Sequence, residues 1–163
     1  MKNLNNYIKI CMRELDDLSI NYSKSVRFEI NRRAKSRYGM CKKENDGFVI
    51  SVSDMLLMDE VDEKSLKDTI IHELLHTCKD CQNHGAQWKK LAQAVNEKYG
   101  YNIKRASSRT EKGLPEIKER DAKYAVCCTV CGKVFERYRM SKLIRYPNMY
   151  CCGVCRGKLK RIK

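Results

Sequence analysis

The sequence has little proline and no long hydrophobic run. These two features argue against a disordered chain and against a membrane-spanning helix. Two prolines in 163 residues, with 42% hydrophobic and 33% charged residues, indicate a folded chain. The longest apolar cluster, residues 55–58, is far shorter than the roughly 20 residues that span a bilayer. The polar start does not resemble a signal peptide, so we expect a cytoplasmic protein without a membrane partner. In that reducing compartment, ten cysteines favour metal ligands or buried side chains over disulfides.

Acidic residues are scarce in the last third of the chain. Residues 1–100 hold 17 Lys and Arg against 15 Asp and Glu, whereas residues 101–163 hold 17 against 5. A region this basic repels itself and is stabilised by a polyanion, nucleic acid first. We therefore expect DNA as a partner, with association to the nucleoid as one consequence. A solubilising surface is the alternative.

Hydrophobic periodicity predicts an initial helix, a small sheet and two further helices. Apolar residues recur every three or four positions from Leu4 to Leu18. Three strands are predicted in "SVRFEINRR", "SRYGMCKK" and "GFVISVS", and the turn "ENDG" between the last two favours an antiparallel meander. Helices are expected over 59–78 and 86–99, the second ending at Gly100. The polar residues 102–123 are typical of a linker or a surface arm.

All three histidines lie within thirteen residues. His72, Glu73 and His76 form H-E-x-x-H on a predicted helix, where the i, i+4 spacing points both imidazoles to one side. His84 is the natural third ligand after a turn. Three protein ligands leave one coordination position open, which is typical of catalytic zinc, and Glu73 is then the general base. The alternative is a solvated helix that happens to carry two histidines.

Cys78 and Cys81 lie between the second and third histidines in the spacing CKDC. Thiolates bind zinc strongly, so these cysteines could replace His84 and close the site into a structural one. A redox pair or a surface disulfide is another reading. Because Cys78 is two residues past His76, the helix directs it away from the metal face. We expect both cysteines to pack inside the connecting turn.

The C-terminal region carries six cysteines in two clusters. Two C-x2-C pairs are separated by twenty residues, which is the spacing of a four-cysteine zinc site. The predicted ligands are Cys128, Cys131, Cys152 and Cys155. Cys127 and Cys151 offer a competing x3 spacing that fits a short knuckle less well. Such a closed site is structural and replaces the core that so short a segment lacks.

Basic and aromatic residues alternate between the two cysteine pairs. The residues predicted to contact phosphates are Arg137, Arg139, Lys142 and Arg145. Tyr138 and Tyr146 are predicted to stack on bases. Alternatively, the tyrosines cover a small core and the charges are solvated.

"HELLHTCKDCQNHGAQWKKLA" resembles the SprT-like zinc metallopeptidases, whose pattern joins H-E-x-x-H to a downstream H-G-x-x-W/F. Gly85 and Trp88 complete that match, and "VRFEINRRAKSRYGMC" is similar to the strand region of the family. The resemblance implies that the three histidines bind zinc and that the glutamate is catalytic. Relatives such as Spartan cleave proteins crosslinked to DNA, and a zinc ribbon commonly ends members. Trp88 is expected to pack its helix against the zinc helix.

These observations predict a two-part α+β protein. A helix and a small antiparallel three-stranded sheet would pack on the H-E-x-x-H helix and the following helix, as a minimal zincin-like core. The expected parts are a peptidase domain over 1–110, a linker over 111–123 and a zinc ribbon over 124–163. Two zinc ions per chain are expected, one catalytic and one structural. The predicted function is proteolysis of DNA-associated or DNA-crosslinked proteins, in their repair.

Two rival functions stay open at this point. The first is a nucleic-acid-binding zinc protein whose histidine site is structural or inactive. The second is a zinc hydrolase with a non-protein substrate, since three histidines activate water without selecting a particular carbonyl.

Overall fold

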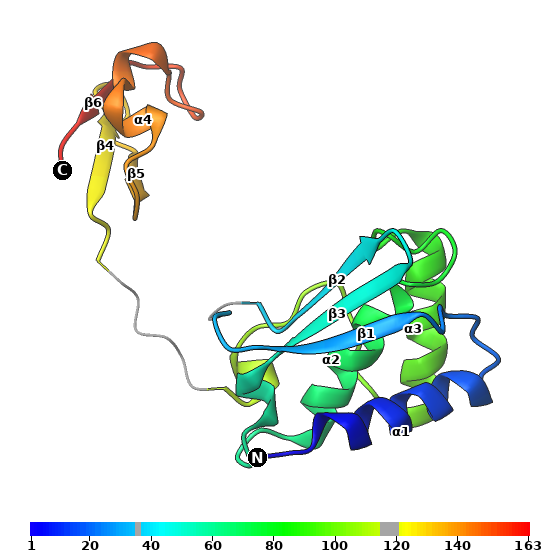
Figure 1. Ribbon diagram of the computed structural model, residues 1–163. Coiled ribbons are helices and arrows are strands. Elements are labelled where there is room, and N and C mark those ends of the chain that lie inside the picture. Colours follow the sequence, from blue (N-terminus) through cyan, green and yellow to red (C-terminus); the bar gives the residue numbers. More distant parts are fainter. Residues whose placement is uncertain (35–36, 115–120) are drawn as a thin grey trace. The chain divides into compact units, whose positions relative to one another are not determined.

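The computed structural model describes residues 1–34, 37–114 and 121–163. The chain divides into two compact units, Met1–Glu116 and Ile117–Lys163. The long helices and one sheet belong to the first unit, and the second contains short strands (Figure 1). Residues 115–120 of the predicted linker lie outside the described residues. No helix in the described ranges has the length and apolarity that a membrane crossing needs.

Three helices of the first unit follow the predicted hydrophobic pattern. Helix α1 (Leu4–Asp17) begins after Asn3, whose side-chain oxygen accepts a hydrogen bond from the Asn5 amide. Helix α2 (Glu63–Leu75) carries the histidine motif, and helix α3 (Ala86–Tyr99) follows it. Gly100 ends α3 in the left-handed conformation, with φ of 68°, as glycine does at many helix ends.

The sheet of the first unit is mixed, so the expected antiparallel meander is wrong. The strands are β1 (Val26–Asn31), β2 (Gly39–Glu44) and β3 (Gly47–Ser53), in the order β1-β3-β2. The β2–β3 pair is antiparallel across the predicted turn, but β1 runs parallel to β3. β3 is the central strand of the sheet. All of its residues 49–53 are buried, which is typical of a strand that is covered on both faces.

Helix α2 lies at the middle of the first unit and is covered on several sides. It packs against α1, α3, β2 and β3, and the short 3-10 helix η1 (Asp54–Leu57) closes one end. Its fully buried apolar side chains are Leu66, Ile70, Ile71, Leu74 and Leu75. Burial of each such side chain contributes about 1.5–3 kcal/mol. The helix that presents the histidines is therefore anchored by its own buried apolar side chains.

The segment after α3 returns across the first unit. Asn96 holds it by two hydrogen bonds, donating to the Ile103 carbonyl (3.0 Å) and accepting from the Ile103 amide (2.8 Å). A 3-10 helix, η2 (Thr110–Lys112), follows. Ile103, Lys112 and Leu114 are buried, so the residues up to 114 form one wall of this unit.

The second unit is a small three-stranded antiparallel sheet. Its elements are β4 (Tyr124–Cys128), β5 (Val134–Arg137), the one-turn helix α4 (Lys142–Arg145), η3 (Pro147–Met149) and β6 (Leu159–Arg161). The strand order is β5-β4-β6. Among the described residues of this unit, the hydrophobic cluster consists of Val126, Cys128, Ile144, Cys152 and Leu159. Two of these five are cysteines, so the hydrophobic contribution to its stability is small.

Candidate metal centres and active site

The structure brings the three histidines together. His72 lies in the last turn of α2, His76 caps the C-terminus of that helix, and His84 precedes α3. The Nε2 atom of His72 is 3.3 Å from that of His76 and 3.0 Å from that of His84. All three imidazoles thus offer a nitrogen to one point, and their ligand atoms lie within 4.8 Å of one another.

The geometry of this group fits a zinc ion. Zinc–nitrogen bonds of about 2.0–2.1 Å at tetrahedral angles place ligand nitrogens about 3.3 Å apart. The Nδ1 of His76 lies 2.7 Å from the Cys81 carbonyl oxygen, to which it donates, and this leaves Nε2 as the metal-binding atom. Burial, followed by the charges of His76 and His84, lowers the pKa of His72 to about 3. The imidazole is therefore neutral, as a metal ligand must be.

Cys78 and Cys81 do not join the histidine group. Among the described residues, the group consists of the three histidines alone. Cys78 is 4% exposed and Cys81 is fully buried, and both are free thiols. Burial raises the pKa of Cys78 to about 11. The pair packs inside the turn, while the backbone of Cys81 orients His76.

Glu73 lies beside the histidines with its carboxylate buried. The residue is 7% exposed and lines a cleft of about 380 Å³ together with all three histidines. Burial raises the pKa of Glu73 to about 7, opposed by a hydrogen bond from the Cys41 backbone and by the charge of Arg37. A carboxylate with a pKa near neutrality suits proton transfer in either direction.

Gly39 on β2 determines where the Glu73 carboxylate lies, a role that no sequence pattern indicated. A Cβ atom at position 39 would lie 2.5 Å from Oε1 of Glu73 and 2.9 Å from Cγ2 of Thr69. Such separations are too short for any real contact, so a side chain at this position would displace the carboxylate. The backbone of β2 thus approaches α2 as closely as glycine permits.

We expect Gly39→Ala to lower kcat/KM for peptide hydrolysis about 100-fold, because the added methyl group moves Glu73 out of position. Zinc content should stay unchanged, since the nearest neighbours of Gly39 are Glu73 and Thr69 and not the histidines. Gly153→Ala is the matched control, as a Cβ there meets nothing within 4 Å. Activity assays and metal analysis of both variants test this prediction. If Gly39→Ala were as active as the wild type, the displacement of the Glu73 carboxylate would have no effect on catalysis.

Trp88 contacts all three imidazoles, which goes beyond its expected role of packing two helices. Its ring centroid lies 4.8 Å from that of His72, 5.7 Å from that of His76 and 4.6 Å from that of His84. The residue is 1% exposed, and in the described structure its Nε1 has no hydrogen-bond partner. The indole therefore acts as an apolar wall that holds the imidazole rings in place.

Trp88→Ala should reduce both stability and zinc affinity. Removal of so large a buried ring costs about 3–5 kcal/mol, and the imidazoles lose the surface against which they pack. Trp88→Phe is the control, because the ring uses no hydrogen bond. Denaturant unfolding and zinc competition against a chelator measure the two effects. Wild-type zinc affinity in the alanine variant would show that α2 alone positions the histidines.

The second unit gathers the four predicted cysteines into another candidate zinc site. Sγ of Cys128 lies 3.4 Å from that of Cys155, and Sγ of Cys131 lies 3.6 Å from that of Cys152. Tetrahedral zinc with bonds of about 2.3 Å places sulfurs about 3.8 Å apart. All four ligand atoms lie within 4.8 Å of one another, so this group also fits zinc.

Backbone amides favour the thiolate form at this site. The Val130 and Cys131 amides donate to Sγ of Cys128, and the Val154 amide donates to Sγ of Cys152. The hydrogen bond from Cys131 is the main reason that the pKa of Cys128 falls to about 6. Cys127 points elsewhere, with its Sγ 3.4 Å from the carbonyls of Cys128 and Gly132.

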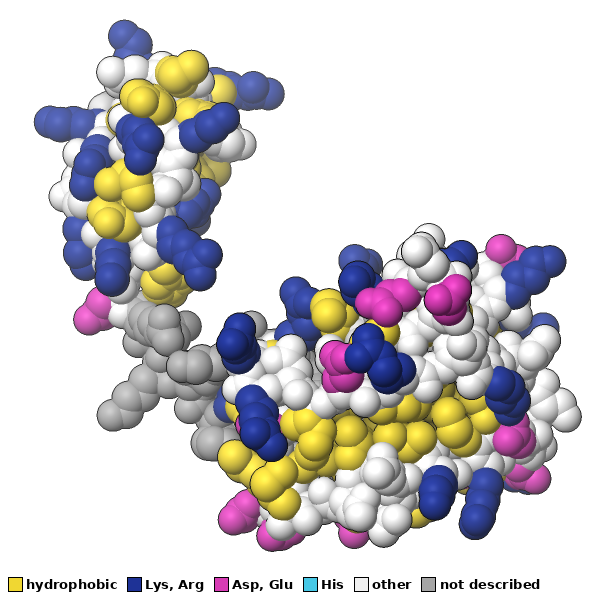
Figure 2. All heavy atoms as spheres, in the orientation of Figure 1, with side chains coloured by type: hydrophobic (Ala, Val, Ile, Leu, Met, Phe, Trp, Pro, Cys, Tyr) yellow, Lys and Arg dark blue, Asp and Glu magenta, His cyan; other side chains and the backbone are white. Residues whose placement is uncertain are grey.

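The residues predicted to contact nucleic acid are all exposed. They lie on β5, on α4 and in the adjoining loops: Arg137, Tyr138, Arg139, Lys142, Arg145 and Tyr146. Tyr138 and Tyr146 are 56% and 51% exposed, so they do not cover the core of the unit. Residues 124–163 hold ten Lys and Arg against one Glu. Figure 2 shows Lys and Arg over the visible face of this unit, interleaved with hydrophobic side chains.

Comparison with protein families places this sequence in a known group. Residues 8–108 match the SprT-like family, a range that includes α1 from Ile8 onward, the sheet, α2, α3 and all three histidines. No curated protein matches the chain. The match covers more than half of the sequence and agrees with the resemblance carried by the histidine motif. The chain therefore belongs to the SprT-like family.

Proposed function

We propose that this protein is a zinc-dependent peptidase that cleaves proteins associated with or crosslinked to DNA. The observation that carries the proposal is the convergence of three imidazoles beside a buried carboxylate, in a chain of the SprT-like family. His72, His76 and His84 would hold the ion. Zinc supplies Lewis acidity, which polarises a carbonyl group and makes water a better nucleophile at neutral pH.

The protein itself supplies proton transfer and positioning. The Glu73 carboxylate accepts a proton from the attacking water and returns it to the amine nitrogen that leaves. The backbones of Gly39 and Cys41 fix the position of that carboxylate. Cys81 and Trp88 fix the imidazoles, so that no ligand has to rearrange when a substrate binds.

The second unit would hold the peptidase on DNA. Exposed arginines and lysines neutralise phosphates, and two exposed tyrosines offer surfaces on which bases stack. Binding to the same DNA molecule raises the local concentration of a protein attached to that DNA. This gives preference for DNA-bound substrates without any selective contact to the substrate protein.

The test compares cleavage of one protein in two states, free and crosslinked to an oligonucleotide. We expect faster cleavage of the crosslinked form at low salt, an advantage that declines as salt rises. Glutamine at the four basic positions 137, 139, 142 and 145 should remove most of that advantage. Duplex binding weakens as salt rises, and the slope of log K against log salt should become less steep by about 0.9 for each phosphate-neutralising side chain that is removed.

The matched control changes the same charge on the first unit by placing glutamine at four exposed positions, Arg13, Lys79, Lys89 and Lys90. Equal losses in both variants would show that net charge alone is responsible. Tight DNA binding without cleavage of any substrate would support the nucleic-acid-binding alternative. Cleavage of small amides but of no protein would support a zinc hydrolase of another specificity.

A further inference from the structure

A second depression opens beside the candidate catalytic cleft. Its volume is about 210 Å³, and it shares Arg37, Gly39, His72 and Glu73 with the cleft that contains the histidines. The rest of its wall comes from α2 and from residues 102–107 and Lys112, the segment that returns across the first unit. A space of this size accommodates one amino-acid side chain. Any group in it lies next to Glu73.

Cations outnumber acids around this depression. Its lining contains Arg37, Lys104, Arg105 and Lys112, against Asp68 and Glu73. Lys104 is neutralised by an ion pair with Glu111. Among the ion pairs of the described residues, none involves Arg37 or Arg105. Arg37 donates to the sulfur of Met40 at 2.9 Å, which is a weak acceptor, and its charge interacts with that of Glu73 without forming an ion pair.

One of these cations is buried in the wall of the depression. Lys112 is 6% exposed and donates to the Ser65 carbonyl at 3.2 Å. Asp68, 7% exposed, accepts from the Asn102 amide at 3.3 Å. Burial lowers the pKa of Lys112, while the nearby charge of Asp68 opposes that change. A buried ammonium group is costly to maintain, and an incoming carboxylate would stabilise it.

The charges of Arg37 and Arg105 also act on the candidate catalytic groups. The charge of Arg37 lowers the pKa of Glu73, and that of Arg105 contributes to the lowered pKa of His84, after burial and His76. Both arginines line the same depression as His72 and Glu73. Guanidinium is also the cation best suited to bind a carboxylate through two hydrogen bonds.

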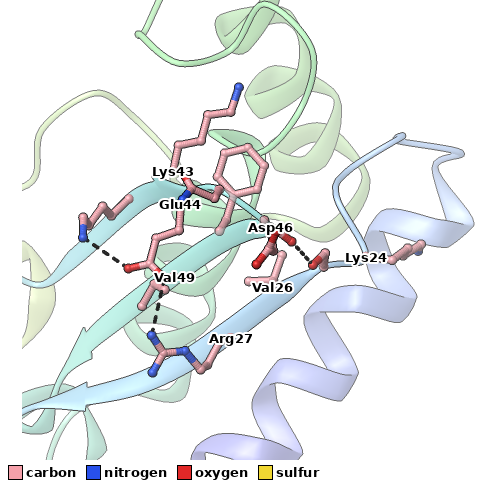
Figure 3. A pocket seen from close by; sticks show the side chains of 12 residues that line it. Lys24, Val26, Arg27, Lys43, Glu44, Asp46 and Val49 are labelled. Carbon is pink, nitrogen blue, oxygen red and sulfur yellow. Dashed lines mark hydrogen bonds and ion pairs between the residues drawn. The ribbon is translucent and has the colours of Figure 1, made fainter.

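Another, larger depression of the first unit has the same numbers of cations and acids in its lining, four against two, but more of its cations are held in ion pairs. It has a volume of about 760 Å³ and lies where β1 begins and β2 turns into β3 (Figure 3). Glu44 pairs there with Arg27 at 3.6 Å and with Lys42 at 3.2 Å, and Lys24 pairs with Asp16 at 2.6 Å. Three of its four cations thus form ion pairs, against one of the four in the smaller depression, which is therefore the better of these two sites for an anion.

We propose that the depression beside Glu73 is a substrate subsite that selects an acidic side chain, Asp or Glu, next to the scissile bond. Arg37 and Arg105 are its specificity-determining residues, and Lys112 provides a fixed positive charge in its wall. This inference rests on the proposed peptidase function. A peptide side chain suits the site better than a nucleic-acid strand. The space holds one side chain, and it adjoins Glu73, the carboxylate that would act on a peptide bond.

The first experiment uses the zinc-loaded full chain and three peptides that differ only by Glu, Gln or Lys beside the cleavage site. We expect kcat/KM for the Glu peptide to exceed that for the Gln peptide about tenfold, with the Lys peptide lowest. Arg37→Gln and Arg105→Gln should each bring the Glu and Gln peptides close to equal. Arg37→Glu should reverse the order. Both arginines are exposed, so these variants should fold.

Arg13→Gln is the matched control, because this exposed arginine lies on α1, outside the lining of the depression. It should leave the ratio between peptides unchanged. The second experiment measures Kd of the same peptides for zinc-loaded Glu73→Gln protein by fluorescence anisotropy, and so does not depend on cleavage. The expected order of affinity is again Glu, Gln, Lys, with the preference lost in Arg37→Gln.

The outcomes separate the two proposals. If the wild type cleaves neither the peptides nor the crosslinked protein but binds the Glu peptide about tenfold more tightly, the peptidase function fails, and the depression stands only as a binding site for acidic side chains. If all peptides are cleaved and bound equally, the subsite fails and the peptidase function stands. If a short oligonucleotide displaces the Glu peptide and itself binds with an affinity that depends on Arg37, the depression is a phosphate site and the proposal is overturned.

Discussion

Replacement of Glu73 by Gln should lower kcat/KM for protein cleavage by about 10²–10⁴-fold, the range that a positioned general base contributes. The amide has nearly the shape of the carboxylate, so the packing against Gly39 is kept. It cannot accept the proton that leaves water. Because the three imidazoles do not depend on Glu73, the variant should bind zinc as the wild type does.

The measurement combines an activity assay, metal analysis and thermal unfolding of the same preparation. Glu60→Gln is the matched control, since Glu60 is exposed and lies outside the lining of the cleft. Near wild-type activity in the Glu73 variant would exclude this residue as the base. Loss of zinc together with activity would instead assign it a structural role.

Removal of the cysteine-bound metal should unfold the second unit and leave the first unit folded. The second unit buries five core residues, whereas the first has its own core centred on α2. Structural zinc contributes about 10–16 kcal/mol of binding energy, far more than so small a core supplies. Cys128→Ser with Cys131→Ser should therefore reduce zinc from two ions per chain to one and abolish DNA binding.

Backbone NMR spectra distinguish the two units in this variant, and cleavage of a small peptide reports on the first. The matched control is Cys127→Ser with Cys151→Ser, because neither residue belongs to the four-cysteine group. In the reverse experiment, His72→Ala with His76→Ala should remove the other ion and keep the second unit folded. A folded second unit without zinc would contradict the expected dependence.

The helices and the histidine group were predictable because local rules determine them. The i, i+4 spacing places His72 and His76 on one side of α2 whatever the rest of the fold does. His84 was the remaining imidazole in the chain, so its place in the group followed from chemistry and a short turn. The apolar periodicity of α1 was equally clear, as its four buried residues show.

The strand order and the surroundings of Glu73 were not predictable in this way. Three short strands joined by short loops do not specify which strand is central, and the central place of β3 is seen only in the burial of residues 49–53. The contact of Gly39 with Glu73 joins residues 34 positions apart and depends on how closely β2 approaches α2. The burial of Lys112 beside the cleft likewise depends on the path of a segment without clear periodicity.

The hydrogen bond between His76 and position 81 has a consequence for how this protein tolerates change. The acceptor is a main-chain carbonyl, so every amino acid at that position provides it, cysteine or not. Exchanges at the exposed positions Lys79 and Gln82 should therefore leave this hydrogen bond intact. Inserting or deleting one residue there would shift the carbonyl away from the ring. For the orientation of His76, the length of this loop is therefore constrained, whereas the identity of residue 81 matters only for packing.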